Sequence, residues 1–195
     1  RHKLDGVKLL SPTDPMQIWC PGRNFPDDTA PPPANGLRSH GLQPWHKGRN
    51  SLIGHDDFIV LPKDSVGDVH YKGEAVAVMG KICRRVTPQA ALRYVLGYTC
   101  GNDVSERQWQ IDDSSLWRSN GSDTFSPVGP WMETDIDPKN LKVSVSVNGS
   151  EVQTSCTKDM VHDFASIISY ISQHVTLHPG DLVFSGTAGS TGPMV

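Results

Sequence analysis

Residues 142–153 constrain the fold more than any other part of the sequence. Val143, Val145 and Val147 alternate with polar residues. This is the period of a strand with one buried face, because successive side chains of a strand point to opposite sides. The pair Asn148-Gly149 follows, and it favours the left-handed backbone of a tight hairpin turn. The sequence therefore predicts an antiparallel β-hairpin over these residues.

Shorter patterns predict the remaining elements. Further strands are expected over residues 58–61, 74–80 and 182–184. One helix should begin at Thr87-Pro88, an N-cap followed by proline at the first helical position, and end at Gly97. A second helix has apolar residues at helical spacing between Phe164 and Val175. These elements predict an α+β domain that is rich in strands and has a few short helices.

Residues 21–49 are rich in proline and glycine. This composition predicts a loop rather than packed elements. A long loop inside a compact domain is usually functional or else disordered. Both interpretations stay open for this segment.

Size and composition limit the classes of function. The chain has 195 residues and a net charge of -3, with no apolar run near the roughly 20 residues that a membrane span needs. Lys and Arg are dispersed, so no nucleic-acid partner is expected. The 4 cysteines form no C-x-x-C pair, which argues against a zinc site or disulfide framework and favours the reducing cytoplasm. The first ten residues lack the apolar stretch of a signal peptide. We expect one domain over residues 1–195, without a membrane segment.

Residues 97–110 concentrate polar side chains just after the predicted helix, which suggests a loop. The polar members are Asn102, Asp103, Arg107 and Gln110. The apolar members, which would anchor the segment to a core, are Tyr98, Val104 and Trp109. A polar segment anchored in this way is how a rigid scaffold presents a binding site. A solvated loop is the alternative.

Several motifs stand in a fixed order along the chain. They are Arg23-Asn24, Ser51-Leu52-Ile53-Gly54, Gly97-Tyr98-Thr99, Asn102-Asp103-Val104-Ser105, Arg107, Trp109-Gln110, Asp123-Thr124-Phe125, Pro127, Gly129-Pro130, Val147-Asn148-Gly149, Thr176-Leu177, Pro179-Gly180-Asp181 and Gly186-Thr187. Their number and order resemble the fumarylacetoacetate hydrolase family over most of the chain, from about residue 15 to about residue 192.

The resemblance implies a mixed β-roll or β-sandwich of the type of that family's C-terminal domain, usually as a homodimer. Residues 1–50 would form a proline-rich N-terminal portion with an active-site loop, and the family pattern continues through further strands beyond residue 195. The implied substrates are small 2-oxo or 1,3-dicarbonyl acids, the implied cofactor is Mg²⁺ or Mn²⁺, and no organic cofactor is implied. In the family pattern, three carboxylates hold the ion, which stabilises an enolate. A His-Glu pair activates water, and a Lys and a Gln stabilise developing negative charge.

The metal positions of this pattern are only partly kept. Glu74 and Asp103 match two of the metal ligands, and Lys72 stands where the remaining carboxylate is expected. Lys72 and Glu74 share one face of a strand. Two interpretations stay open. Either Glu74 and Asp103 bind the ion weakly against repulsion from Lys72, or the three side chains form an ion cluster that replaces the metal.

Other chemistry positions also differ. Asp28 stands at the position of the catalytic histidine, Pro31 near that of its glutamate partner, and Asn120 at that of the oxyanion lysine. The resemblance thus gives Gln110, Asp28, Lys72 and Asn120 as catalytic candidates. It gives Arg23, Lys47, Arg107, Gln110 and Thr187 as substrate-binding candidates. A surface role for Lys47 is the alternative, and His70 is either a substitute ligand on the face of Glu74 or a structural histidine.

Two classes of function follow. The first is an enzyme that acts on a small oxo-acid or diketone, where tautomerisation, decarboxylation, hydration or cyclisation needs only enolate stabilisation, whereas hydrolysis also needs activated water. The second is a fold relative without catalysis that binds a ligand or forms a heteromer. Fold analogy alone does not decide between them.

Overall fold

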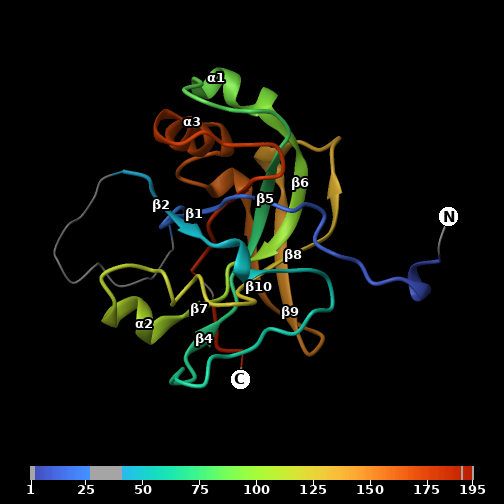
Figure 1. The fold of residues 1–195 in the computed structure, drawn as a ribbon, viewed down its shortest axis with the longest axis vertical. Coiled ribbons are helices and arrows are strands. Elements are labelled where there is room, and N and C mark those ends of the chain that lie inside the picture. The colour runs from blue at the N-terminus through green and yellow to red at the C-terminus, as the bar shows by residue number, and fades with distance from the viewer. Residues whose placement is uncertain (1–2, 27–40, 190, 195) are drawn as a thin grey trace.

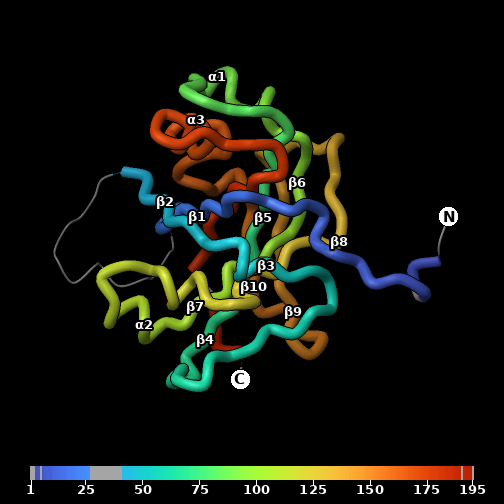
Figure 2. Tube along the Cα trace, viewed as in Figure 1, coloured from blue at the N-terminus to red at the C-terminus, as the bar shows by residue number. Residues whose placement is uncertain are grey.

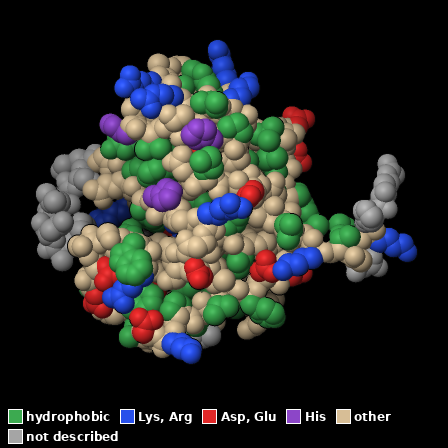
Figure 3. All heavy atoms as spheres, viewed as in Figure 1, with side chains coloured by type: hydrophobic (Ala, Val, Ile, Leu, Met, Phe, Trp, Pro, Cys, Tyr) green, Lys and Arg blue, Asp and Glu red, His purple; other side chains and the backbone are tan. Residues whose placement is uncertain are grey.

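The computed structural model describes residues 3–26, 41–189 and 191–194. Asp28, Pro31 and the rest of residues 27–40 in the proline-rich segment lie outside these residues. Among the described residues, no helix is long and apolar enough to cross a membrane. Acidic and basic side chains are interspersed over the face of the molecule seen in Figure 3.

A seven-stranded mixed sheet forms the centre of the molecule (Figure 1). In sheet order its strands are β2 (Gln43–Lys47), β1 (Ile18–Gly22), β11 (Leu182–Phe184), β5 (Gly73–Met79), β6 (Val95–Asn102), β8 (Ser126–Glu133) and β3 (Leu52–Ile53). The pairs β1–β11 and β3–β8 are parallel and the other pairs are antiparallel. The expected strands at 74–80 and 182–184 are thereby confirmed.

Two small ladders flank this sheet. β9 (Lys142–Val147) pairs with β10 (Ser150–Cys156), and β4 (Val69–His70) pairs with β7 (Ser105–Glu106). The β9–β10 hairpin turns at Asn148 and Gly149, whose φ angles are 52° and 81°. Both values lie in the left-handed region that this turn type requires, so the predicted hairpin is confirmed.

Three short α-helices and several 3-10 turns complete the described fold. The helices are α1 (Pro88–Ala91), α2 (Arg107–Asp112) and α3 (Phe164–His174). The 3-10 turns are η1 (Leu4–Gly6), η2 (Arg49–Ser51), η3 (Leu92–Tyr94), η4 (Pro138–Asn140) and η5 (Thr157–Asp159). Asp163 caps α3 by accepting a 2.8 Å hydrogen bond from the backbone nitrogen of Ser166.

The two larger clusters of the core lie on opposite faces of β5, which is buried on both faces, and a smaller cluster contains Val69, Val104 and Phe125. On one face, the apolar stripe of α3 packs against β5 and β6 (Figure 2), with Ile167, Ala77 and Tyr98 among the buried residues. On the other face, side chains of β1, β5, β8 and β11 pack against each other, with Val76 and Phe184 near the middle. Burial on both faces explains why β5 reads as a continuous apolar run in the sequence.

Four predictions about local structure are wrong. The segment 21–49 is not loop throughout, because its residues 43–47 form β2 of the central sheet. Residues 58–61 form no strand: Phe58 is 87% exposed, and the backbone nitrogen of Val60 donates to Thr124 Oγ1 instead of to a strand. The helix that starts at Pro88 does not reach Gly97, since Val95 already pairs with β5 and Gly97 is a strand residue.

The polar segment 97–110 is not a loop either. Its first part is β6, its middle holds β7, and its last part is α2. Pairing with β5 decides the conformation of the first part, an interaction with residues distant in sequence that local patterns do not reveal. The predicted anchors are confirmed, because Tyr98, Val104 and Trp109 are all buried.

Candidate functional site

Lys72 and Asp103 face each other where two central strands meet. The β5–β6 ladder pairs Gly73 with Asn102, and the backbone nitrogen of Asp103 then donates to the carbonyl of Lys72 at 2.9 Å. This further step of the ladder brings the two side chains together. Lys72 Nζ donates to Asp103 Oδ2, and both side chains are buried.

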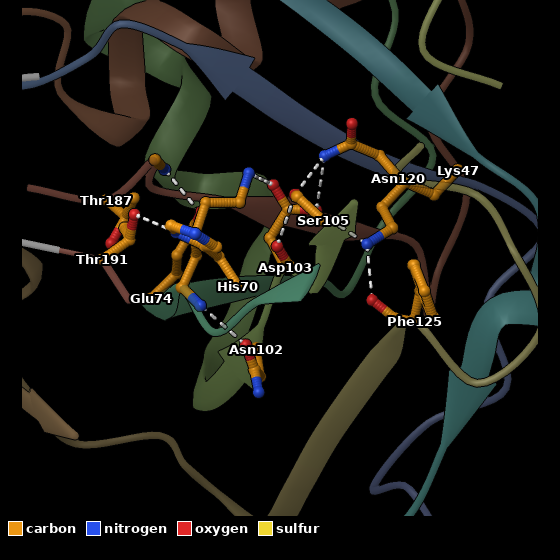
Figure 4. Close-up of polar contacts among 12 residues, drawn as sticks. Lys47, His70, Glu74, Asn102, Asp103, Ser105, Asn120, Phe125, Thr187 and Thr191 are labelled. Carbon is orange, nitrogen blue, oxygen red and sulfur yellow. Dashed lines mark hydrogen bonds and ion pairs between the residues drawn. The ribbon is translucent and has the colours of Figure 1, made fainter. Parts of the chain in front are cut away.

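Lys47 joins this pair from the end of β2. Its Nζ donates to Asp103 Oδ1 at 2.7 Å and to the carbonyl of Phe125 at 2.6 Å (Figure 4). The side chain is fully buried. The alternative of a surface role for Lys47 is therefore wrong, and the two ammonium groups share one carboxylate.

The carboxyl groups of Asp103 and Glu74 have opposite electrostatic surroundings. Burial alone would raise the pKa of Asp103, but the charges of Lys47 and Lys72 outweigh it and lower that pKa to about 2. Burial, helped by the negative charge of Asp103, raises the pKa of Glu74 to about 8. Burial thus dominates for Glu74, whereas the lysines dominate for Asp103.

Glu74 is held by the backbone rather than by a lysine. Its Oε2 accepts a 2.7 Å hydrogen bond from the backbone nitrogen of Gly186. Gly186 has a φ of 77°, and a Cβ there would lie 2.9 Å from the Cβ of Asn24. Both the conformation and the close contact require glycine, so the motif that includes Gly186 positions this carboxyl group.

The donor set does not fit a three-carboxylate metal site. Both oxygens of Asp103 accept hydrogen bonds from ammonium groups, and Lys72 occupies the position of the remaining ligand. Within residues 3–26, 41–189 and 191–194, no group of three or more His, Cys, Asp or Glu is placed to hold an ion. At a separation of 4 Å and an effective dielectric constant of 20, each ammonium would repel a divalent ion by about 8 kcal/mol. Of the predicted Lys72–Glu74–Asp103 ion cluster, the Lys72–Asp103 pair is present. Lys47 joins this pair, whereas Glu74 accepts a hydrogen bond from Gly186 instead.

A chain of amide groups leads away from Asp103. Asn120 is fully buried, and its Nδ2 lies 3.5 Å from Asp103 Oδ1 and 2.6 Å from Ser105 Oγ. Gln110 Nε2 donates to Asn120 Oδ1 at 3.0 Å, and Arg107 Nη1 donates to Gln110 Oε1 at 2.9 Å. The structure therefore brings three residues predicted from the sequence, Asn120, Gln110 and Arg107, into one connected series with Asp103.

The series continues to a histidine. Arg107 Nη2 donates to Thr191 Oγ1 at 2.7 Å. The same oxygen lies 3.1 Å from His70 Nδ1 (Figure 4). The other ring nitrogen, Nε2, lies 2.9 Å from Asp68 Oδ1. Thr191 belongs to this network but was missed in the sequence, because a lone hydroxyl residue carries no distinguishing pattern. Ser105 was part of a quoted motif but was not named as a site residue.

The other two predicted substrate-binding residues are Thr187 and Arg23. Thr187 donates through Oγ1 to the carbonyl of Gly73 at 3.2 Å and accepts from Gln153 Nε2 at 2.5 Å. Gln153 was not named as a site residue from the sequence. Gln153 lies in the predicted hairpin and contacts both Thr187 and Gly73, the first residue of β5. Arg23 is exposed directly after β1, with a φ of 53°.

The ring of Trp45 packs beside the ammonium group of Lys72. Lys72 Nζ lies 5.1 Å from the centre of the Trp45 ring, a distance at which a cation is attracted to the ring face. The indole Nε1 of Trp45 is buried and has no hydrogen-bond partner in the described part of the chain. An oxygen atom of a bound ligand could satisfy this donor.

Comparisons with known proteins agree with the sequence motifs. The family model described as fumarylacetoacetate (FAA) hydrolase C-terminal matches residues 17–195. The chain is 44% identical over 151 residues to a Sphingomonas protein named 2,4-didehydro-3-deoxy-L-rhamnonate hydrolase, covering 75% of this chain and 52% of that protein. It is 35% identical over 191 residues to the rat protein named oxaloacetate tautomerase Fahd2a, mitochondrial, covering 95% of this chain and 60% of that protein.

A solved structure shows the same fold. It is that of a 2-hydroxyhepta-2,4-diene-1,7-dioate isomerase from Mycobacterium marinum, with a TM-score of 0.87 and 37% sequence identity, covering 97% of this chain and 70% of that one. The chain thus spans about half to three quarters of the length of these relatives. Both the family match and the shared topology confirm the fold expected from the motifs. The chain belongs to the fumarylacetoacetate hydrolase family and has the fold of that family's C-terminal domain.

Proposed function

We propose that this protein binds a small 2-oxo or 1,3-dicarbonyl acid and catalyses its tautomerisation by stabilising the enolate with lysine ammonium groups. The observation that carries this proposal is the contact of two buried ammonium groups with the single carboxylate of Asp103. This contact set has more positive than negative charge. An anionic ligand beside Lys72 would balance it, and the indole N–H of Trp45 offers a further donor.

The ammonium of Lys72 would supply the charge that stabilises an enolate oxygen. Electrostatic stabilisation of this kind is strong in a site that excludes water, because fixed charges are poorly screened there. Asn120 and Gln110 are held by their neighbours in defined orientations and would position the ligand. Arg107 can hold a carboxylate with two parallel hydrogen bonds.

Tautomerisation fits this set of residues better than hydrolysis of a carbon–carbon bond. Hydrolysis needs a base that activates water, and the family's His-Glu positions are Asp28 and Pro31 in this chain. Tautomerisation only moves a proton between carbon and oxygen. The names of the relatives include a tautomerase and an isomerase beside a hydrolase, so tautomerisation is among the reactions named for relatives of this chain.

We further propose that Glu74 and Asp103 bind Mg²⁺ or Mn²⁺ only weakly, that no organic cofactor is used, and that the chain forms a homodimer in the cytoplasm. The weak metal binding follows from Lys72, whose ammonium stands where the family pattern has a carboxylate. No step of the proposed reaction depends on the ion.

A ligand-binding or heteromer-forming protein without catalysis is the second candidate. One observation favours it: polar groups of the site satisfy each other, as Asp103 does with two lysines and Gln110 with Arg107 and Asn120. A site that is closed in this way is stable without substrate.

The two candidates are separated by binding and turnover measured on the same protein. Oxalate, a mimic of the enolate form, is titrated by calorimetry in the presence of EDTA. The keto–enol conversion of oxaloacetate is then followed by the absorbance of the enol. We expect both binding and a rate above the spontaneous one. Binding without turnover would favour the second candidate, and the absence of both would refute an oxo-acid site.

A further inference from the structure

One residue at the edge of the site has the contacts of a proton acceptor. His70 is partly buried, lies two positions before Lys72 and four before Glu74, and precedes them on the same extended segment. Residues at these spacings point to one face of such a segment. His70 is thereby on the side of the chain that carries the candidate site.

Two routes connect His70 to Asp103. The first runs along the backbone to Lys72, which binds Asp103 directly. The second starts at His70 Nδ1 and passes through side-chain contacts of Thr191, Arg107, Gln110 and Asn120. Both routes end at Asp103, and a substrate held by Arg107 and Lys72 would contact a residue of each.

The partners of the ring fix its tautomer. A carboxylate can only accept, so the Nε2 atom that lies 2.9 Å from Asp68 Oδ1 carries the hydrogen. The hydroxyl of Thr191 accepts from Arg107 and donates its hydrogen to Nδ1. Nδ1 is therefore the basic atom of the neutral ring, and it faces Thr191, which Arg107 also contacts.

We propose that His70 is the catalytic base of this site and that Asp68 is the positioning residue that orients it. The inference rests on the proposed function, since it names the group that moves the proton of the enolisation. The charged groups that face the ring, from within the described residues, are Asp68 directly and Arg107 through Thr191.

The proposed step is balanced without any further reactant. The substrate takes the place of the Thr191 hydroxyl at Nδ1. Nδ1 then takes a proton from the carbon next to the carbonyl of the oxo-acid, and the electron pair of that C–H bond becomes the double bond of the enolate. The negative charge moves to the oxygen beside Lys72. The imidazolium, stabilised by Asp68, then returns its proton to that oxygen, which gives the enol and the neutral ring.

The test measures proton abstraction and ligand binding separately. The methyl protons of pyruvate exchange with D2O when a base removes them, and NMR gives the rate with the intact chain in EDTA. A general base contributes on the order of 100-fold or more, so His70→Ala should lower the exchange rate by about that factor. Calorimetry should show oxalate affinity within about threefold of the unmodified protein, and added imidazole should restore part of the exchange.

A matched control is available in the same chain. His55 also lies beside an aspartate, with its Nε2 3.6 Å from Asp56 Oδ2, but the pair is exposed. His55→Ala should leave exchange and binding unchanged. Asp68→Asn should lower exchange with unchanged oxalate affinity, and His70→Asn serves as a second variant in case His70→Ala fails to fold.

Each outcome decides the inference. Loss of exchange with retained oxalate binding and rescue by imidazole supports it. Exchange that persists in folded His70→Ala, or that is absent from an unmodified protein that binds oxalate, overturns the role of His70 while leaving the binding site in place. If the unmodified protein does not bind oxalate, the proposed function fails, and the role of His70 fails with it.

Discussion

Lys47 Nζ and Asp103 Oδ1 lie 2.7 Å apart with both side chains fully buried, so an ion pair joins the end of β2 to the end of β6. The other oxygen of Asp103 accepts from Lys72. A buried charge is costly unless it is paired, and here one carboxylate compensates two cations. The cluster should therefore matter for stability as well as for ligand binding.

Removing the shared carboxylate should be the most damaging change in this cluster. Asp103→Asn leaves the ammonium groups of Lys47 and Lys72 without their ion-pair partner and is expected to lower the free energy of unfolding by about 3–5 kcal/mol. Lys47→Met should cost less, about 1–3 kcal/mol, because Asp103 keeps Lys72 while the carbonyl of Phe125 loses a donor. Urea denaturation at neutral pH measures both values.

The control for this prediction is a surface ion pair. Lys142 Nζ lies 3.9 Å from Glu151 Oε2, and both side chains are mostly exposed. Lys142→Met should leave the free energy of unfolding nearly unchanged, since exposed pairs contribute little. A value for Asp103→Asn as small as that of Lys142→Met would contradict the account of the buried cluster.

Lys72 should control the affinity for divalent ions. In the unmodified protein, Mg²⁺ or Mn²⁺ would meet an ammonium group at the position of a ligand, so calorimetry should show weak binding at most. Lys72→Glu replaces the ammonium with a carboxylate next to Glu74 and Asp103, and micromolar binding should appear.

A second charge reversal separates a local effect from a general one. Lys63 is exposed in the segment before β4, and Lys63→Glu changes the net charge of the protein by the same amount. It should leave ion binding as it was. Micromolar Mg²⁺ affinity in the unmodified protein would be incompatible with the proposed role of Lys72.

Glu74 should make stability depend on pH. Burial, reinforced by Asp103, raises its pKa from 4.5 to about 8 in the folded protein, so between these values the folded state binds its proton more tightly than the unfolded state. Its contribution to stability is therefore complete below about pH 4.5 and is lost as the pH rises through 8. Glu74→Gln keeps a neutral group that can accept from Gly186, and it should flatten this decline in thermal or urea melts.

The pKa of the exposed carboxylate Glu133 is shifted in the opposite direction to that of Glu74. Hydrogen bonds from the backbone nitrogens of Asp135 and Thr134 lower the pKa of Glu133, so its contribution changes only in acid. Glu133→Gln should leave the slope between pH 5 and 8 unchanged. An unmodified protein whose stability does not fall over that interval would show that Glu74 is ionised in the fold.

Sequence patterns identified the elements that local forces decide. The β9–β10 hairpin follows from alternation and a turn that needs left-handed residues, and α3 follows from its apolar stripe. These patterns gave wrong predictions where pairing with residues distant in sequence decides the backbone conformation. Val95 and Gly97 lie in β6 because β5 offers pairing partners, which local propensity does not contain.

The site shows the same division. Motifs gave Lys72, Asp103, Asn120, Gln110 and Arg107, which the structure joins by direct or successive contacts. The motifs could not give the burial of Lys47 or the hydroxyl of Thr191. These depend on how separate strands meet in space, and a single lysine or threonine has no periodic signature.

An exposed apolar surface should form the contact of the expected homodimer. Leu4, Val7, Phe58 and Trp131 line one groove, and Phe58 and Trp131 are 87% and 67% exposed. Apolar groups gathered in this way often mark association sites. Light scattering should give a dimer mass at micromolar concentration, and Trp131→Glu should shift it towards the monomer.

Trp117 supplies the control for this surface. It is 70% exposed but lies in the segment between α2 and β8. Trp117→Glu should leave the dimer intact, so that a loss confined to Trp131→Glu locates the interface. A monomer mass for the unmodified protein would rule out the homodimer.

Arg107 and Gln110 should separate ligand binding from catalysis. Arg107 is always charged and can hold a carboxylate through two nitrogens, so Arg107→Ala should weaken oxalate binding by about 2–3 kcal/mol, typical of a lost charge-assisted hydrogen bond. Gln110 Nε2 now donates to Asn120, and with substrate present it can donate to the enolate oxygen. Because that bond strengthens as negative charge develops, Gln110→Ala should lower turnover of oxaloacetate more than it lowers oxalate affinity.

The control for both changes is on the outer face of the same helix. Gln108 Nε2 donates to Asp112 Oδ1 in an exposed contact within α2. Gln108→Ala should leave binding and turnover unchanged, which excludes a general effect of altering this short helix. Calorimetric titration of pyruvate, oxalate and oxaloacetate against all three variants provides the comparison. Oxalate binding that ignores Arg107→Ala would mean that the pocket no longer recognises oxo-acids by their carboxylate, and the protein without catalysis would then be the better account of this chain.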